Sequence, residues 1–323
     1  KNSQIAMVAH HLVVDALSLG SLMEDIGKLL DAALKGELDD QKPSLPLKTS
    51  SYKDYCESVL NQVETGKLQS VIDFWLEKAG DSKIAEIDIP VDNPKGDNVE
   101  KHAERVFFTL DEEMTQHLSQ TVSQHSNLTV SDVLAIALAK VVSQWTGKPD
   151  VILDIANQGR PDDCDVDLSR TVGWFGSGFP ALFEVPTVPV AELLSSMNSQ
   201  FENVASNGMK LRWVQQLSSD KTLVSKLESV TSSKISLNYL GSIGNQKVSL
   251  SQADDSKEVT LRAPENARLY LHEVSAFMSG GELSVSWVYS KDQYQKETIS
   301  TLLSGIEELL QLFAKGELSG GAG

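Results

Sequence analysis

The sequence has few of the residues that mark several common protein classes. Only two cysteines, Cys56 and Cys164, occur in 323 residues, far apart in the sequence, and neither lies in a metal-ligand spacing pattern. This argues against a disulfide framework or a zinc site and favours a reducing compartment. Basic residues are also scarce, since 28 lysines and arginines stand against 45 aspartates and glutamates, a net charge of -17. Because phosphate binding needs basic side chains, we expect no nucleic-acid partner.

Long apolar segments are missing as well. No apolar run approaches the roughly 20 residues that a membrane helix needs, and the opening residues KNSQIAMVAHH lack a signal-peptide pattern. We therefore expect a soluble, cytoplasmic protein without a membrane partner. The remaining composition, with 41% hydrophobic residues, is that of an ordinary globular protein with two domains or one large one.

Strand and helix patterns alternate along the chain, which predicts an α/β fold. Apolar runs and alternation predict strands over residues 5–9, 105–110, 151–155, 172–185, 234–240, 269–277 and 282–289. Helical spacing predicts one or two helices over 52–78 and single helices over 19–30, 111–123, 129–145, 190–203 and 299–313. Ser18 is the expected cap of the first helix, and Thr129 with Asp132 is the expected capping pair before Val133.

Three stretches bear on how the chain is divided. Residues 88–98 hold prolines and a glycine among acids and amides, which predicts an interior boundary. Residues 319–323 are rich in glycine and predict a flexible tail. A first strand at 5–9 would have no earlier partner strand, so we expect part of a sheet to be missing from this sequence.

The adjacent pair His10 and His11 is the first candidate for chemistry. Neighbouring side chains of a strand point to opposite faces, so we expect one histidine to face the core and the other a cleft. An imidazole with a pKa of about 6.5 can move protons at neutral pH. Asp15, at the start of the following helix, can hold the local geometry through a salt bridge or a backbone amide. Taken alone, the pair can also be two purely structural histidines.

Several segments together resemble the condensation and epimerization domains of nonribosomal peptide synthetases. Residues 10–18, HHLVVDALS, match the motif HHxxxDxxS. Residues 165–175, DVDLSRTVGWF, are similar to a block of the epimerization branch, and residues 238–241, NYLG, resemble a later motif of that branch. Residues 269–290 resemble the end of such a domain. Because these matches follow one another in the right order, the chain is identified as a member closest to the epimerization branch.

The resemblance implies a chloramphenicol-acetyltransferase-like fold, in which two lobes form a V around a tunnel. Residues 1–92 would be the remainder of the N-terminal lobe, 93–316 the C-terminal lobe and 317–323 a flexible tail. The tunnel would admit the phosphopantetheine arms of carrier proteins. These carriers and the rest of a multidomain synthetase would be the partners, with no intrinsic cofactor and no metal.

The resemblance also assigns roles to individual residues. His11 would be the catalytic acid or base. The supporting residues would be His10, Asp15 and Ser18. The residues expected to line the tunnel are Asn238, Tyr239, Ala156, Asn157 and Trp174.

Two positions depart from the family pattern. The residue after the motif aspartate is Ala16 instead of glycine, which we expect to narrow the tunnel slightly. Epimerization domains carry Glu-Gly-His-Gly-Arg where this sequence has Ala-Asn-Gln-Gly-Arg at residues 156–160. The glutamate expected to work opposite the histidine is therefore Ala156, whose methyl group cannot carry a proton. Weaker candidates for a second proton carrier are a water molecule and Asp154, Asp163, Asp165 or Tyr239.

Three functions stay open from the sequence. The first is epimerization of a carrier-bound aminoacyl or peptidyl thioester, with His11 exchanging the α-proton. The second is a reaction that needs only His11, such as amide or ester formation or dehydration on a carrier-bound chain. The third is a non-catalytic module that docks carrier proteins or a tailoring enzyme.

Overall fold

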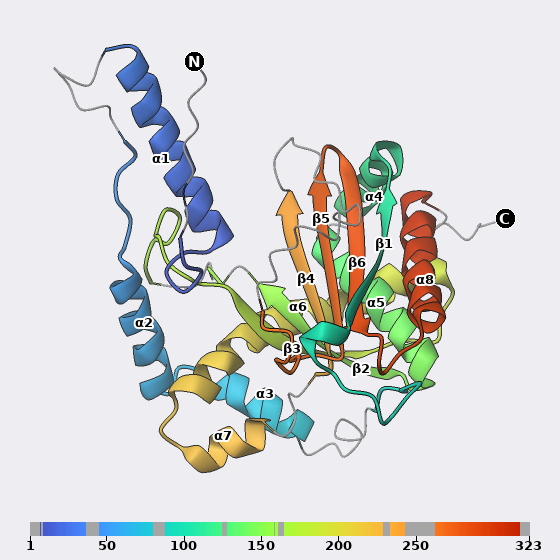
Figure 1. Cartoon of the computed structure of the whole chain (residues 1–323). Coiled ribbons are helices and arrows are strands. Elements are labelled where there is room, and N and C mark those ends of the chain that lie inside the picture. The colour runs from blue at the N-terminus through green and yellow to red at the C-terminus, as the bar shows by residue number, and fades with distance from the viewer. Residues whose placement is uncertain are drawn as a thin grey trace.

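The fold is built around one mixed β-sheet of six strands in the order β1-β6-β5-β4-β2-β3 (Figure 1). The computed structural model describes residues 7, 9–36, 45–79, 88–124, 128–157, 159–160, 165–228, 233–242 and 262–316. The pairs β2·β4 and β4·β5 are parallel and the other neighbours are antiparallel. The strands are β1 (Ala103–Leu110), β2 (Asp150–Asn157), β3 (Ser177–Glu184), β4 (Ile235–Ser242), β5 (His272–Ser279) and β6 (Glu282–Ser290).

Most of the helices form two groups. One group covers one face of the sheet and consists of α4 (Glu112–Gln124), α5 (Val130–Thr146) and α8 (Lys296–Ala314). In the second group, α6 packs on β3 and also contacts α2, α3 and α7. Its members are α2 (Tyr52–Glu64), α3 (Gln69–Ala79), α6 (Val190–Leu217) and α7 (Lys221–Glu228). The short 3-10 helix η2 (Glu100–His102) precedes β1, and α1 (Ala16–Leu34) stands apart from the sheet in Figure 1.

The main core lies between the sheet and the first group of helices. Buried side chains such as Leu138, Leu153 and Trp287 belong to it. His272 is also fully buried there, and its Nδ1 accepts a hydrogen bond from Trp287 Nε1 at 3.1 Å. Burial lowers the pKa of His272 to about 3, so this histidine is a neutral core residue.

Many predicted elements are confirmed because their signals are local. Thr129 and Asp132 form a full capping box at the start of α5, and Gly147 ends the helix in the left-handed conformation. The hairpin β5–β6 turns at residues 280–281, where the sequence has two glycines. The range 52–78 forms two helices, and strands and helices were correctly placed at 105–110, 111–123, 151–155, 234–240 and 299–313.

Two predicted elements differ in length from those observed. The helix expected to end at Asn203 continues to Leu217 as α6. It contains Gly208, where a Cβ would overlap the ring of Phe179, so the glycine allows close packing. The strand expected over 172–185 is reduced to β3, since the backbone of residues 173–175 bonds to the segment that follows His11. Helix α7 was not predicted.

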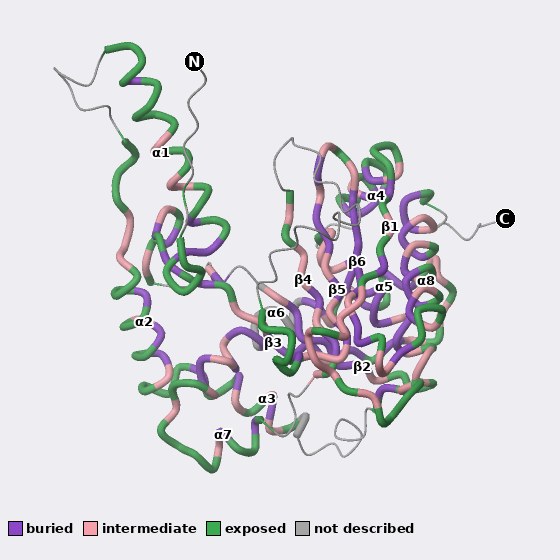
Figure 2. Tube along the Cα trace, in the orientation of Figure 1, coloured by how far each residue is buried: buried purple, intermediate pink, exposed green. Residues whose placement is uncertain are grey.

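The N-terminal region departs most from expectation. Of the strand predicted at 5–9, the structure describes Met7 and Ala9, which are exposed and lie outside any strand. The apolar residues that gave α1 its helical pattern are largely open, with Met23 55% exposed, and Figure 2 shows α1 mainly in the colour of exposed residues. The predicted tail lies outside the described residues, and the division at residue 92 stays a prediction. None of the described helices has the length and apolar character needed to cross a membrane.

Candidate active site

The two histidines lie in a turn that precedes α1. The amide of Val13 donates to the carbonyl of His10 at 3.0 Å, and both histidines are exposed. The expectation that one of them faces the core is therefore wrong, because this segment is a turn and not a strand. His10 Nδ1 accepts a hydrogen bond from the Leu12 amide at 3.1 Å, whereas the ring of His11 lies 5.1 Å from that of Trp174. His11 is thus the histidine with an open imidazole beside an aromatic surface.

Asp15 fixes this turn to the start of α1. Its carboxylate caps the helix by accepting from the Ser18 amide at 2.7 Å, so the predicted capping role of Ser18 is wrong. It also forms a two-point ion pair with Arg160, with N···O distances of 2.7 and 3.1 Å. Burial alone would raise the pKa of Asp15, but the hydrogen bonds from Arg160 and Ser18 outweigh it and hold the pKa below 3.8. The structure therefore confirms both the salt bridge and the backbone amide bond expected of Asp15.

Arg160 joins the turn to the rest of the molecule. Besides the Asp15 ion pair, it donates to the Ser18 hydroxyl at 3.0 Å and to the carbonyl of Thr171 at 3.1 Å. Its guanidinium lies 4.2 Å from the centre of the Phe175 ring. The preceding Gly159 has a φ of +71°, and a Cβ at this position would clash with the carbonyl of Phe175. Gly159 is thus required by close packing against Phe175, and Arg160 by its buried ion pair with Asp15.

The segment 171–175 forms the second wall of the site. Gly173 O accepts from the Asp15 amide at 3.0 Å, and Gly173 N donates to the Ser18 hydroxyl at 3.1 Å. The Tyr52 hydroxyl donates to Trp174 O at 2.8 Å. These bonds hold Phe175 in the core and leave the Trp174 side chain 41% exposed next to His11.

Ala156 and Asn157 end strand β2, two residues before Gly159. Ala156 is half-buried and pairs with Gly178 of β3, and the backbone of Asn157 pairs with Ser177. Asp154, the nearest acid on the same strand face, is buried and accepts from the Tyr270 hydroxyl at 2.6 Å and from Arg212 at 3.0 Å. These two donors tie its Oδ2, while Oδ1 is buried with no hydrogen-bond partner among the described residues.

Of the other acids considered for proton transfer, Asp165 is exposed, and Asp163 lies outside the described residues together with Gln158.

Asn238 and Tyr239 point to opposite faces of β4. Asp154 of β2 pairs with Ser236 of β4, so Asn238 shares a sheet face with Asp154 and Ala156. Tyr239 packs against the core on the helix-covered face, where its hydroxyl contacts Met278 Sδ at 3.0 Å. Burial raises the pKa of Tyr239. The structure thus places Asn238 on the Ala156 side of the sheet and Tyr239 on the other.

No role was predicted for Arg160, although its side chain joins Asp15 and Ser18 to the backbone of Thr171. The signal was the Gly-Arg match to the family segment, but an ion pair between residues so far apart in the chain is not visible from spacing. Arg170 binds Glu24 and Asp25 of α1 at 2.6 and 2.5 Å. Within the described residues, no three acidic, histidine or cysteine side chains are grouped as metal ligands would be.

Comparison with known proteins supports the family resemblance that the sequence motifs indicate. Residues 2–318 match the family model described as "Condensation domain". A linear gramicidin synthase polypeptide of Brevibacillus parabrevis is 30% identical over 99% of this chain, and tyrocidine synthase 2 of the same organism is 26% identical over 92%. The chain spans only 4% and 8% of the length of these two relatives.

Solved structures agree with this match. The epimerization domain from the third module of tyrocidine synthetase B superposes with a TM-score of 0.80 at 25% identity, covering 96% of this chain and 68% of that one. The SgcC5 protein from Streptomyces globisporus superposes with a TM-score of 0.66 at 16% identity, covering 95% of this chain and 68% of that one, which shows a shared fold alone.

Proposed function

Because the chain belongs to the condensation-domain family, in the condensation/epimerization superfamily of nonribosomal peptide synthetases, we propose that it acts on an aminoacyl or peptidyl thioester held by a carrier protein. The α/β fold of the chloramphenicol-acetyltransferase type, predicted from the resemblance, is confirmed by the superposed structures. The proposed reaction is epimerization at the α-carbon, with His11 as the acid and base.

The observation that carries the proposal is the setting of His11. The imidazole is exposed beside Trp174, while Asp15 and Arg160 anchor the turn that carries it. An open imidazole on a fixed backbone can take the α-proton of a thioester, whose carbonyl makes that proton acidic, and can return it. The superposition with an epimerization domain supports this reaction over other chemistry on the same fold.

The phosphopantetheine arm of the carrier would bring the thioester to the site. This arm contains amide groups, and the sheet face next to Ala156 offers the uncharged polar side chains of Ser236, Asn238 and Ser275 to bind them. When bound, the arm supplies the thioester that makes the α-proton acidic. The carrier domains, the remaining synthetase and a cytoplasmic location are parts of the same proposal.

Ala156 favours a second candidate function. A methyl group stands where the family's glutamate would deliver or take the second proton, and Asp154 is already bound to Tyr270 and Arg212. A reaction that needs His11 alone, such as amide or ester formation or dehydration, fits this observation. The replacement of the glutamate by Ala156 also fits a non-catalytic module that docks carrier proteins or a tailoring enzyme.

An isotope experiment separates these functions. A carrier protein loaded with an L-aminoacyl thioester is incubated with the protein in deuterated water, and α-deuterium and chirality are measured. We expect exchange that falls at least ~100-fold in His11→Ala, whereas His117→Ala, an exposed histidine of α4, serves as the matched control and keeps full activity. Amide product without exchange, after adding an acceptor-loaded carrier, would establish the second function. Binding without turnover would establish the docking module.

A further inference from the structure

Strand β1 forms one edge of the sheet and has an open side. Its pairing with β6 is continuous from Ala103 to Leu110, without a bulge. The Lys291 amide donates to the His102 carbonyl at 2.8 Å, which continues this ladder by one rung. Because rungs alternate in an antiparallel pair, the N–H and C=O groups of Arg105 and Phe107 point away from β6. This side of β1 therefore presents unpaired backbone groups to which another strand can bind.

The opposite edge of the sheet is protected in a way that β1 is not. On β3, Pro180 lacks an N–H, and the side-chain amide of Gln200 binds both the N–H and the C=O of Glu184 at 2.9 Å. No described residue binds the outward backbone groups of Arg105 or Phe107 in this manner. Phe107 is also 45% exposed. An accessible, regular edge with an exposed aromatic side chain is a typical site of strand addition.

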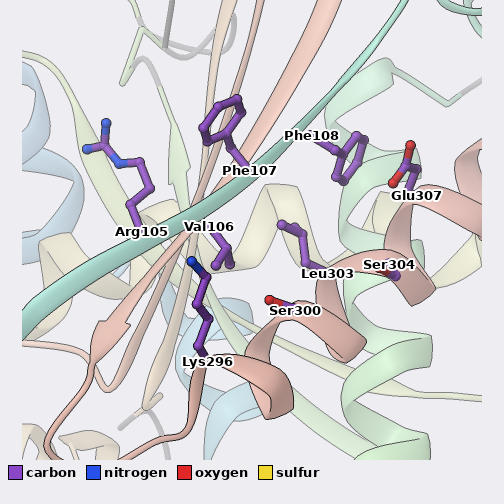
Figure 3. Close-up of a pocket in the computed structure, with 9 residues that line it drawn as sticks. All are labelled: Arg105, Val106, Phe107, Phe108, Lys296, Ser300, Leu303, Ser304 and Glu307. Carbon is purple, nitrogen blue, oxygen red and sulfur yellow. The ribbon is translucent and has the colours of Figure 1, made fainter. Parts of the chain in front are cut away.

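A groove of about 420 Å³ runs along this open edge, between β1 and α8. Strand β1 contributes Arg105, Phe107 and Phe108, and α8 contributes Lys296, Leu303 and Glu307. Figure 3 shows Arg105 and Lys296 at one end of the groove and Phe108 and Glu307 at the other. The groove therefore has a positive end and a negative end, and between them lie apolar side chains together with the hydroxyls of Ser300 and Ser304.

The charges at the two ends are not neutralised within the described part of the chain. Arg105, Lys296 and Glu307 have no described ion-pair partner, although other arginines such as Arg160 and Arg212 pair closely with acids. Lys296 and Glu307 are three turns of α8 apart, about 16 Å. Residues four apart in an extended strand lie on one face and span about 13 Å. Long, flexible side chains can bridge the remaining gap between this span and the distance from Lys296 to Glu307.

We infer that this groove binds an extended peptide segment of a partner protein, which adds to β1 as an extra strand. The segment carries an acidic side chain that meets Lys296, with Arg105 adding positive charge from the other face of β1, and a basic side chain, four residues away on the same face as the acid, that meets Glu307. Its residues between these charges are small or apolar, since they pack over Leu303 on one face and Phe107 on the other. Backbone hydrogen bonds to Arg105 and Phe107 provide the binding, and the two charges select the direction of the strand.

Two peptides of identical composition test the inference. One is fluorescein-labelled Ser-Glu-Val-Thr-Val-Lys-Ser, and the other has glutamate and lysine exchanged. Both carry the same net charge, so long-range repulsion from the acidic protein is equal. Anisotropy titrations are expected to show that one peptide binds the full chain at least about fivefold more tightly than the other, the effect of two well-placed ion pairs.

Variants then show whether the groove is the binding site. The triple variant R105Q/K296E/E307K is expected to invert the preference, while K315E, an exposed lysine at the end of α8, keeps it. Phe107→Pro removes an outward N–H without breaking a β6 rung and is expected to weaken both peptides about tenfold. Thermal melts check that each variant folds. If Phe107→Pro does not fold, the triple variant alone is enough to test whether the groove is the binding site.

Several results would overturn the inference. They are no binding up to about 1 mM peptide, equal affinity of the two peptides for the wild type, or a preference that survives in the triple variant. Sedimentation analysis provides a further test. A concentration-dependent dimer that Phe107→Pro abolishes would show that a second copy of this chain occupies the edge in place of a partner peptide.

Discussion

At the scale of single residues, the Asp15 carboxylate does two jobs at one point of the chain. It caps α1 through the Ser18 amide and neutralises Arg160, whose side chain is only 13% exposed. Charged hydrogen bonds of this kind are stronger than neutral ones, and their loss leaves a buried guanidinium without a counter-ion. Asp15 thereby controls the turn that carries His11 without touching the imidazole.

The effect of Asp15→Asn should therefore depend on pH. At pH 7 we expect the free energy of unfolding to fall by about 3 kcal/mol, because the buried Arg160 loses its partner. The folded-state pKa of Asp15 is lowered, so its contribution is complete above the unfolded value of about 3.9 and is lost as the pH falls through the folded value. Urea unfolding at pH 7, 5, 4 and 3 should show the gap between the two proteins narrowing below about pH 4.

The control for this measurement is Asp165→Asn, which changes an exposed carboxylate. Its unfolding free energy should stay close to that of the wild type at each pH. A gap between Asp15→Asn and the wild type that remains constant down to pH 3 would contradict the role of the ionised carboxylate.

A second residue-scale prediction concerns Ala156. Glutamate at this position would stand at the end of β2, on the sheet face that also carries Asn238. If His11 exchanges the α-proton and lacks an opposite partner, Ala156→Glu should raise the rate of α-deuterium incorporation at least about tenfold. Ala156→Gln has the same shape without an acid, so equal rates in the two variants would show that proton transfer is not the cause.

The sequence predicted the residues of this site better than the bonds between them. His11, Asp15 and Ser18 could be identified because they lie within one short motif. The contacts of Ser18 with Gly173 and of Asp15 with Arg160 join residues 155 and 145 positions apart, and no local pattern encodes such pairs. Asn238 and Tyr239 were both expected to line the tunnel, yet strand alternation sends neighbouring side chains to opposite faces.

At the scale of elements, the accuracy of prediction followed how local the determining interactions are. Helix α5 was predicted to its ends because Thr129, Asp132 and Gly147 act within one turn of their own helix. The predicted end of helix α6 came too early, since the close packing of Gly208 against the ring of Phe179 in β3 involves another element and cannot be seen in the sequence of the helix itself. The segment 172–176 has strand-like residues, but its backbone bonds to Asp15 and Ser18 in place of a neighbouring strand.

Helix α1 gives the element-scale prediction. Its apolar residues are largely exposed, and two ion pairs from Arg170 to Glu24 and Asp25 connect it to the segment that carries Trp174. Such partly exposed pairs contribute less than about 1 kcal/mol each, so Arg170→Ala should change global stability little. It should, however, speed hydrogen exchange of the α1 amides, because local opening of the helix becomes easier.

Hydrogen–deuterium exchange measured by mass spectrometry tests this expectation. Lys53→Ala is the matched control, since it removes the pair with Glu57 inside α2 and leaves α1 untouched. Faster exchange in α1 for Arg170→Ala alone would support the connection. Equal exchange in the two variants would mean that α1 is held by Asp15 and Ser18 without help from Arg170.

At the scale of the whole molecule, like charges oppose one another. Acidic residues exceed basic residues by 45 to 28, and the ion pairs of the described surface use many of the available cations. The surplus of negative charge therefore repels itself in the folded state. The unfolded chain is more expanded and relieves this repulsion, which lowers stability at low ionic strength.

Added salt should consequently stabilise this protein. Screening weakens the attraction within surface ion pairs as well as the repulsion, but the pairs contribute little and the repulsion acts over the whole surface. Raising NaCl from about 20 to about 300 mM should increase Tm by roughly 1–2 °C, which corresponds to about 1 kcal/mol for a chain of this size. Differential scanning calorimetry in NaCl and in KCl checks this expectation, since general screening acts equally in both salts. A Tm that falls with salt, or rises in one salt alone, would show that specific ion pairs outweigh the net charge.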